Sequence, residues 1–194
     1  MRYLTHAIIC LGLWFPALAF SQSGISISNV SGYQISEYYR LNADLDYVLS
    51  DKVIDALQHG VSLNFVITIS IYQKRQWLWD KPIADKYLHY QLDYHPLSER
   101  YLVINTTSGS SEDFFSLQAA LRYLGTIRAQ TIIATTQLQD EQDYYLLFHA
   151  KLDVESLPGP LQPLVLFSTD WHMSSPHKTI PFADMPVETI KKTS

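Results

Sequence analysis

Residues 63–71 read LNFVITISI, and every second side chain from Leu63 to Ile71 is apolar. The positions between them are mostly polar and include Asn64, Thr68 and Ser70. Successive side chains of a β-strand point to opposite faces, so this period of two predicts a strand with one buried face. About eight strands are expected, because the alternation recurs and shorter apolar stretches accompany it. The other segments are residues 25–30, 41–49, 88–95, 101–105, 131–138, 146–153 and 168–173.

Two segments break this alternation and carry the signals of helix ends. The first begins at Ser50, a favourable N-cap, and ends at Gly60. The second begins with Ser110 and Asp113, which resemble a capping box, and ends at Gly125. Two short helices among many strands indicate a mainly β fold. We predict an antiparallel β-sandwich, immunoglobulin-like in outline, rather than a doubly wound sheet.

The composition is sufficient for one packed domain. Of the 194 residues, 47% are hydrophobic and 17% are charged, which excludes intrinsic disorder for most of the chain. We predict a single β-sandwich domain over residues 24–175. Residues 176–194 are polar and contain Pro181 and Pro186, so we predict a flexible C-terminal tail there.

The N-terminus has the features of a secretory signal peptide over residues 1–19. A short basic start precedes an apolar run, and Ala17 and Ala19 occupy the two positions that a signal peptidase reads. We expect cleavage after Ala19, with Ser21 as the alternative. The apolar run is shorter than the roughly 20 residues that span a bilayer, which argues against an anchor. The expected location is therefore periplasmic, with no transmembrane span after cleavage.

Several classes of chemistry lack their usual residues. The only cysteine, Cys10, lies within the predicted signal peptide, so the mature chain would have no thiol for catalysis, redox chemistry or zinc binding. No Gly-rich phosphate loop occurs, and we expect no cofactor. The 14 Lys and Arg against 19 Asp and Glu give a net charge of −5. A nucleic-acid partner is not expected, because such binders need a concentrated basic surface.

An ordered set of short motifs runs along nearly the whole mature chain. It consists of Leu57-x-x-Gly60-Val61-x-Leu63, Trp77-x-Trp79-Asp80, Leu97 with Arg100-Tyr101, Phe115-Ser116-Leu117-x-x-Ala120-Leu121, Leu157-Pro158-x-Pro160-Leu161 and Trp171-x-x-Ser174-Ser175. The set resembles a family of exported Gram-negative proteins catalogued as domain of unknown function forty-three-ninety. The resemblance implies an envelope location and no established activity, so it transfers no catalytic residue.

His89, Asp93 and His95 lie at alternate positions of one predicted strand and therefore share a face. Imidazole and carboxylate groups ligate divalent metals, so these residues are weak candidates for part of a metal site. His149 and Asp153 repeat the pattern on another predicted strand, which favours an ordinary polar outer face. A complete site needs several converging ligands, and no metal is predicted.

Asp170, His172 and the neighbouring hydroxyls, such as Ser168, supply the residue types of a hydrolytic triad. No Gly-x-Ser-x-Gly elbow is present, however. Neighbours along a strand point to opposite faces, so Asp170 and His172 could pair without a nucleophile between them. We therefore assign no catalytic residue.

The most unusual cluster is KRQWLWD at residues 74–80. If the strand from residue 63 continued, Trp77 and Trp79 would keep the parity of its apolar face, and burial is the default expectation for large aromatic residues. Gln73 and Arg75 share that parity but are polar, which indicates a bend or bulge that resets the register.

If the register is reset, Arg75, Trp77, Trp79 and Asp80 are binding residues in a contact patch with an apolar centre and a polar rim. We predict a non-enzymatic binding or accessory module that contacts another envelope protein or an envelope-derived ligand. One alternative is an envelope hydrolase or metal-dependent enzyme, which would require the candidate histidines and carboxylates to converge. A second is a carrier of an apolar ligand between its sheets, which would require an internal void.

Overall fold

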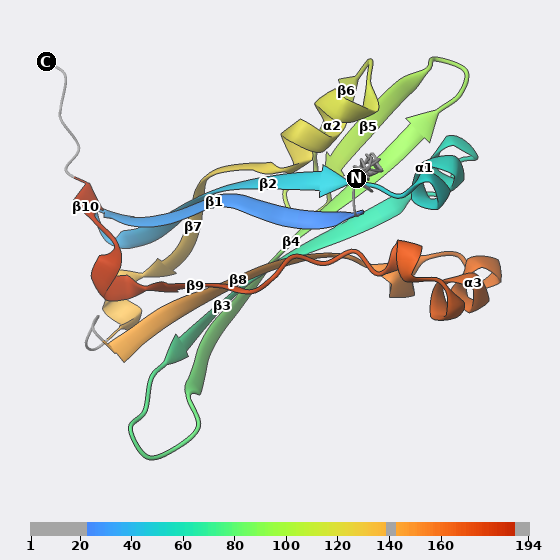
Figure 1. Ribbon diagram of the computed structural model, residues 1–194. Helices are drawn as coiled ribbons and strands as arrows, with labels where there is room; N and C mark the ends of the chain where they lie inside the picture. The colour runs from blue at the N-terminus through green and yellow to red at the C-terminus, as the bar shows by residue number, and fades with distance from the viewer. Residues whose placement is uncertain (1–22, 139–142, 189–194) are drawn as a thin grey trace, which may run out of the picture.

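The computed structural model describes residues 23–138 and 143–188 of the chain. Its strands form two sheets, one of six strands and one of four (Figure 1). The larger sheet has the order β6 (Ser110–Phe114), β5 (Arg100–Asn105), β4 (Lys81–His95), β3 (Leu63–Gln73), β8 (Tyr144–Leu152) and β9 (Lys178–Pro181). The smaller has the order β10 (Val187–Glu188), β1 (Gly24–Ile35), β2 (Tyr38–Val48) and β7 (Thr126–Ala134). All pairs are antiparallel except that of β10 with β1.

Strand β3 lies inside the larger sheet and is paired on both sides. Ile67 lies opposite Leu88 of β4 and Ala150 of β8. The alternating apolar residues from Leu63 to Ile71 are at most 1% exposed, as their period of two predicts. This face forms the centre of the core.

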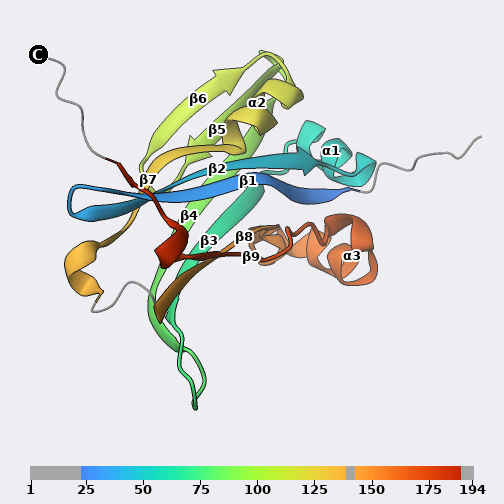
Figure 2. The same ribbon diagram turned by 60° about the vertical axis from the view of Figure 1, so that its left-hand side comes forward.

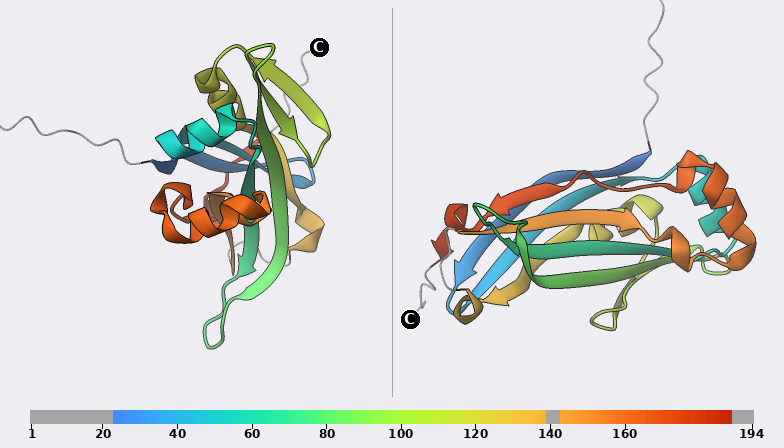
Figure 3. Two further views of the ribbon diagram at one scale, coloured as in Figure 1. Left: turned by 90° about the vertical axis from the view of Figure 1, so that its right-hand side faces the viewer. Right: turned by 90° about the horizontal axis from the view of Figure 1, so that it is seen from below.

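The smaller sheet covers that apolar face. Leu41 and Ala43 of β2 are fully buried, and the ring of Tyr47 meets Phe65 of β3 edge to face at 5.1 Å. In Figures 1 and 3 the strands of the smaller sheet run across those of the larger one. The predicted mainly β, sandwich-like architecture with short helices is confirmed.

Helix α1 (Asp51–Gln58) begins where its sequence predicts. The Oγ of Ser50 accepts a hydrogen bond from the amide of Val53 at 3.3 Å, which satisfies one of the free amides of the first turn. The helix buries Val53 and Leu57. It leads directly from β2 of the smaller sheet to β3 of the larger one.

The predicted start of the second helix at Ser110 is wrong. Residues Ser110–Phe114 form β6 instead, where Asp113 accepts a 2.7 Å hydrogen bond from Nε of Arg100 on β5. Helix α2 (Leu117–Leu124) is capped by Ser116 and ends at Gly125, as the C-terminal signal predicts. A Cβ at Gly125 would collide with the carbonyl oxygen of Leu45, so this close approach of α2 to β2 requires glycine.

The predicted strand over residues 168–173 is also wrong. Residues 159–171 form successive helical turns, η4 (Gly159–Leu161), α3 (Gln162–Phe167) and η5 (Thr169–Trp171). Pro160 and Pro163 favour these turns, since proline fits a first helical turn and cannot donate to a strand ladder. Helices α1 and α3 lie at the same end of the molecule (Figures 1 and 3).

The predicted flexible tail is wrong for the residues that the structure describes there. Strand β9 pairs with β8, η6 (Phe182–Asp184) follows it, and β10 pairs with β1. Phe182 and Met185 are 2% and 7% exposed. The core therefore extends past the predicted boundary at residue 175, because these two apolar side chains pack into it. The last residues, 189–194, and the predicted signal peptide lie outside the described part of the chain.

Phe182→Ala should lower the free energy of unfolding by about 3–5 kcal/mol, as for other buried aromatic residues. The lost packing includes an edge-to-face contact with Tyr39, whose ring centroid is 4.7 Å from that of Phe182. Urea denaturation measures the change. Val187→Ala is the control, since Val187 is 70% exposed and should change stability by less than about 0.5 kcal/mol. Equal effects of the two substitutions would contradict the packing of this segment.

Candidate functional site

The most exposed large apolar cluster lies at the tip of the β3–β4 hairpin, defined here as residues 74–80. Trp77, Leu78 and Trp79 are 92%, 69% and 93% exposed. The hairpin projects beyond the rest of the sandwich, on the side away from α1 and α3 (Figures 1 and 2). The default expectation that both tryptophans are core residues is therefore wrong.

A break in strand register explains the failed expectation. Ile71 lies opposite Ala84, whereas Tyr72 lies opposite Pro82, so one residue of β4 is left out of the pairing. The last pair is Gln73 with Lys81, and the strand parity of Leu63 to Ile71 does not continue into the tip. The polar residues Gln73 and Arg75 signal this reset in the sequence.

Hydrogen bonds hold the base of the tip against β8. The carboxylate of Asp80 accepts from the Tyr145 hydroxyl at 2.8 Å and from the backbone amide of Arg75 at 3.2 Å. The Lys74 amide donates to the carbonyl of Asp143 at 2.6 Å. The Tyr145 ring also stacks on Tyr72, with centroids 5.5 Å apart. These contacts fix both ends of the tip and leave residues 76–79 projecting.

The Asp80–Tyr145 contact stays intact at neutral pH. The hydrogen bond from Tyr145, followed by that from the Arg75 amide, lowers the pKa of Asp80. Burial of the phenol, the hydrogen bond to Asp80 and the negative charge of Asp80 raise the pKa of Tyr145 to about 12. Asp80 is therefore ionised and Tyr145 protonated, which are the forms that this hydrogen bond requires.

The tip carries positive charge around its apolar residues. Lys74 and Arg75 precede the tryptophans, Lys81 follows them, and all three side chains are exposed. The single carboxylate in this stretch, Asp80, is held by Tyr145. Residues 74–81 thus contain three cations and one anion, whereas the whole chain carries a net charge of −5.

The structure does not assemble the weak metal candidates into a site. His89 and His95 are exposed on β4, and both Asp93 oxygens accept from Nε2 of Gln91, at 2.9 and 3.1 Å. Over residues 23–138 and 143–188, no group of three or more His, Cys, Asp and Glu side chains is arranged to hold a metal. His149 and Asp153, on and just after β8, do not join these residues in such a group.

The triad-like residues form a polar cluster around α1. The Ser168 hydroxyl donates directly to Asp170 at 2.8 Å, and Lys52 forms a 2.7 Å ion pair with the same carboxylate. These two contacts, that of Lys52 first, lower the pKa of Asp170. The His172 ring lies 3.1 Å from the backbone carbonyl oxygen of Ser168. The imidazole is therefore not placed between the carboxylate and the hydroxyl as a general base would be.

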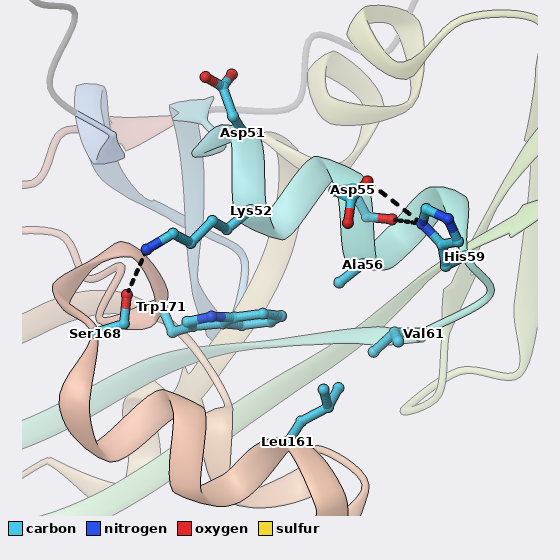
Figure 4. A pocket seen from close by; sticks show the side chains of 9 residues that line it. All are labelled: Asp51, Lys52, Asp55, Ala56, His59, Val61, Leu161, Ser168 and Trp171. Atoms are coloured by element: carbon cyan, nitrogen blue, oxygen red, sulfur yellow. Dashed lines mark hydrogen bonds and ion pairs between the residues drawn. The ribbon is translucent and has the colours of Figure 1, made fainter.

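Sequence reasoning missed a pocket of about 630 Å³ between α1 and the η4–η5 segment (Figure 4). Trp171, Val61 and Leu161 supply much of its apolar lining. Lys52 at its rim is paired with Asp170, and Nδ1 of His59 lies 2.7 Å from the carbonyl oxygen of Asp55. The apolar lining of the pocket can shelter a small apolar group. In the sequence, only the amphipathic pattern of α1 pointed to this region.

Trp77→Ala and Trp79→Ala should each change the free energy of unfolding by less than about 0.5 kcal/mol, because exposed side chains contribute little packing. Trp171→Ala is the matched control. Its side chain is 5% exposed, so truncation should lower stability by about 3–5 kcal/mol. Thermal and urea denaturation of the three variants distinguish the positions, and a large loss from Trp77→Ala would restore the core assignment.

The pKa of His149 should lie below the usual value for histidine, about 6.5. Its pKa is lowered by partial burial, then by His177, whose ring is stacked on it at 4.4 Å, and by Lys151. As the pH falls through about 6.5, the imidazole of His149 is therefore protonated in the unfolded chain before it is protonated in the folded one. The free energy of unfolding that neutral His149 contributes is thus present above this pH and is lost as the pH falls further. NMR titration of Lys151→Gln should show a higher His149 pKa than in the unmodified protein. Lys52→Gln should leave it unchanged, and an unshifted His149 in Lys151→Gln would contradict this assignment.

Comparison with known proteins identifies the family and no function. No curated protein and no solved structure gives a significant match. Within the part of the chain that the structure describes, no helix has the length and apolar character needed to cross a membrane. The family model named "Domain of unknown function (DUF4390)" matches residues 22–181. This match covers most of the chain, from β1 to β9 and including the hairpin tip, and the protein therefore belongs to the DUF4390 family.

Proposed function

We propose that this protein is a non-enzymatic binding module of the cell envelope and that the β3–β4 tip is its recognition element. The observation that carries the proposal is the exposure of Trp77, Leu78 and Trp79, at 92%, 69% and 93%. Three consecutive exposed apolar residues give the fold no packing energy and increase the risk of aggregation. Contact with a partner accounts for them.

The composition of the tip is that of a binding hot spot. Tryptophan offers a large contact area with only two side-chain torsions to fix, and it is enriched among residues that dominate interfaces. Lys74, Arg75 and Lys81 would form a polar rim around the apolar centre. Truncating a tryptophan in such a cluster typically weakens binding by about 2 kcal/mol or more.

The hairpin also fixes the base of the tip before any partner binds. The β3–β4 ladder reaches Gln73 and Lys81, and the Asp80–Tyr145 hydrogen bond ties the base of the tip to β8. A partner would therefore meet a tip whose two ends are already fixed, and only residues 76–79 would have to be ordered when it binds. The envelope location in this proposal is supported by the signal-peptide pattern of residues 1–19.

The alternative functions have weaker support. A hydrolase is disfavoured because the Ser168 hydroxyl is hydrogen-bonded to Asp170 rather than to an imidazole. A carrier of an apolar ligand between the sheets is disfavoured because the inward residues Phe65, Ile67 and Ile69 pack in the core at no more than 1% exposure.

Site-specific photo-crosslinking in intact cells tests the binding role. A photoreactive phenylalanine analogue placed at position 78 should form adducts upon irradiation. The same analogue at position 97 is the matched control, because Leu97 is fully exposed in the turn between β4 and β5. Adducts at position 78 should disappear when Trp77 and Trp79 are both changed to Ser, while the melting temperature stays unchanged. Equal yields at the two positions, or adducts that survive loss of both tryptophans, would refute the proposal.

A further inference from the structure

Resting on the proposed function of the tip, we infer that its partner is the surface of a phospholipid bilayer with anionic headgroups. The tip would insert Trp77, Leu78 and Trp79 at the level of the headgroups, with Lys74, Arg75 and Lys81 against the lipid phosphates. Shape, side-chain chemistry and charge each contribute to this inference.

The shape of the tip favours a deformable partner. The β3–β4 hairpin projects beyond the two sheets (Figures 1 and 2), and the apolar side chains at its tip are largely exposed. A protein partner would have to supply a surface shaped to fit these projecting side chains. A bilayer surface accepts a projecting apolar group without a preformed pocket.

The side chains at the tip suit the interface between water and lipid. Tryptophan has an apolar body and one polar N–H, and it concentrates at membrane–water interfaces for that reason. Leu78 between the two tryptophans adds apolar area that a bilayer can bury. The three residues therefore present together the chemistry of an interfacial anchor.

The charge of the tip is complementary to anionic lipid. Lys74, Arg75 and Lys81 are exposed beside the tryptophans, whereas the Asp80 carboxylate is held at the loop base by Tyr145 and the Arg75 amide. Each cation near an anionic membrane surface strengthens partitioning by about fivefold. The net charge of −5 would oppose adsorption of the molecule as a whole, so its approach through this end is favoured.

The backbone limits the depth of insertion. Residues 76–79 lie outside the strand ladder, and their amides form no hydrogen bond with another residue in the described part of the chain. Unsatisfied backbone groups are very unfavourable in the hydrocarbon core of a bilayer, so the tip would stop among the headgroups. The predicted binding is therefore peripheral and reversible.

Vesicle flotation tests the inference with the full chain. Vesicles of phosphatidylcholine and phosphatidylglycerol should carry the protein upward, and phosphatidylcholine vesicles should carry less. Partitioning should fall about fivefold for each of Lys74→Gln and Arg75→Gln, and it should weaken as salt rises. Changing Trp77, Leu78 and Trp79 together to Ser should abolish the partitioning that depends on the tip. Leu97→Ser, the matched control, should keep it.

Tryptophan fluorescence gives an independent readout. Emission from the unmodified protein should shift to shorter wavelength with anionic vesicles, and lipids brominated near the headgroup should quench it. The triple-Ser protein keeps Trp14 and Trp171, so its emission gives the background signal that vesicles produce without the tip. All variants share the same N-terminus, so any contribution of residues 1–22 to lipid binding is common to them.

The outcomes separate this inference from the proposed function. If the unmodified and triple-Ser proteins float equally, or neither floats, the lipid assignment is wrong. Should position 78 nevertheless crosslink to a protein in a way that requires Trp77 and Trp79, the binding module stands and its partner is a protein. Absence of both flotation and crosslinking would overturn both proposals.

Discussion

Burial of one face of β3 against the smaller sheet is the interaction on which the other features depend. Leu63, Phe65 and Ile67 are at most 1% exposed, and Phe65 meets the ring of Tyr47 from β2. Burial of apolar side chains is the dominant favourable contribution to folding. Because β3 is also paired with β4 and β8, its position fixes the register of the larger sheet. That register places the β3–β4 hairpin and its tip.

The same arrangement leaves the tip unsupported. Strand β3 is flanked on both sides as far as Gln73, which pairs with Lys81 of β4 and Tyr144 of β8. Beyond that point the chain has no sheet to join, and Asp80 closes the base of the loop through Tyr145. A firm base and a free apolar tip thus arise from the same strand, which connects the core of the fold to the proposed recognition element.

The sequence predicted the elements whose signals are local. The period of two marks β3, and Ser50 marks the start of α1. It failed where tertiary contacts compete with those signals. Ser110 and Asp113 resemble a helix start, but Asp113 lies on β6 and accepts a hydrogen bond from Arg100 of the neighbouring strand β5. The polar composition of residues 176–194 predicted a flexible tail, but Phe182 and Met185 are buried in the core.

At the candidate site, the sequence supplied the residues and not their exposure. The cluster of Arg75, Trp77, Trp79 and Asp80 was identifiable from composition alone. Whether its tryptophans continue the buried face of β3 depends on one register break close to the end of the strand. The alternation of side chains in the sequence does not fix the position of that break. The pocket beside Trp171 was missed because it is formed by α1 and a segment more than a hundred residues later, whose helical turns were not predicted.

Hydrogen exchange, followed by mass spectrometry on the chain alone and with anionic vesicles, tests most directly whether a firm hairpin presents a free tip to a membrane. The account predicts that amides of Leu63–Ile71 exchange slowly, because they are buried and paired, and that amides of residues 76–79 exchange rapidly in the free protein. Vesicles should slow exchange at residues 74–80 more than anywhere else. Protection of residues 76–79 equal to that of β3 in the free protein, or vesicle protection centred elsewhere, would contradict it.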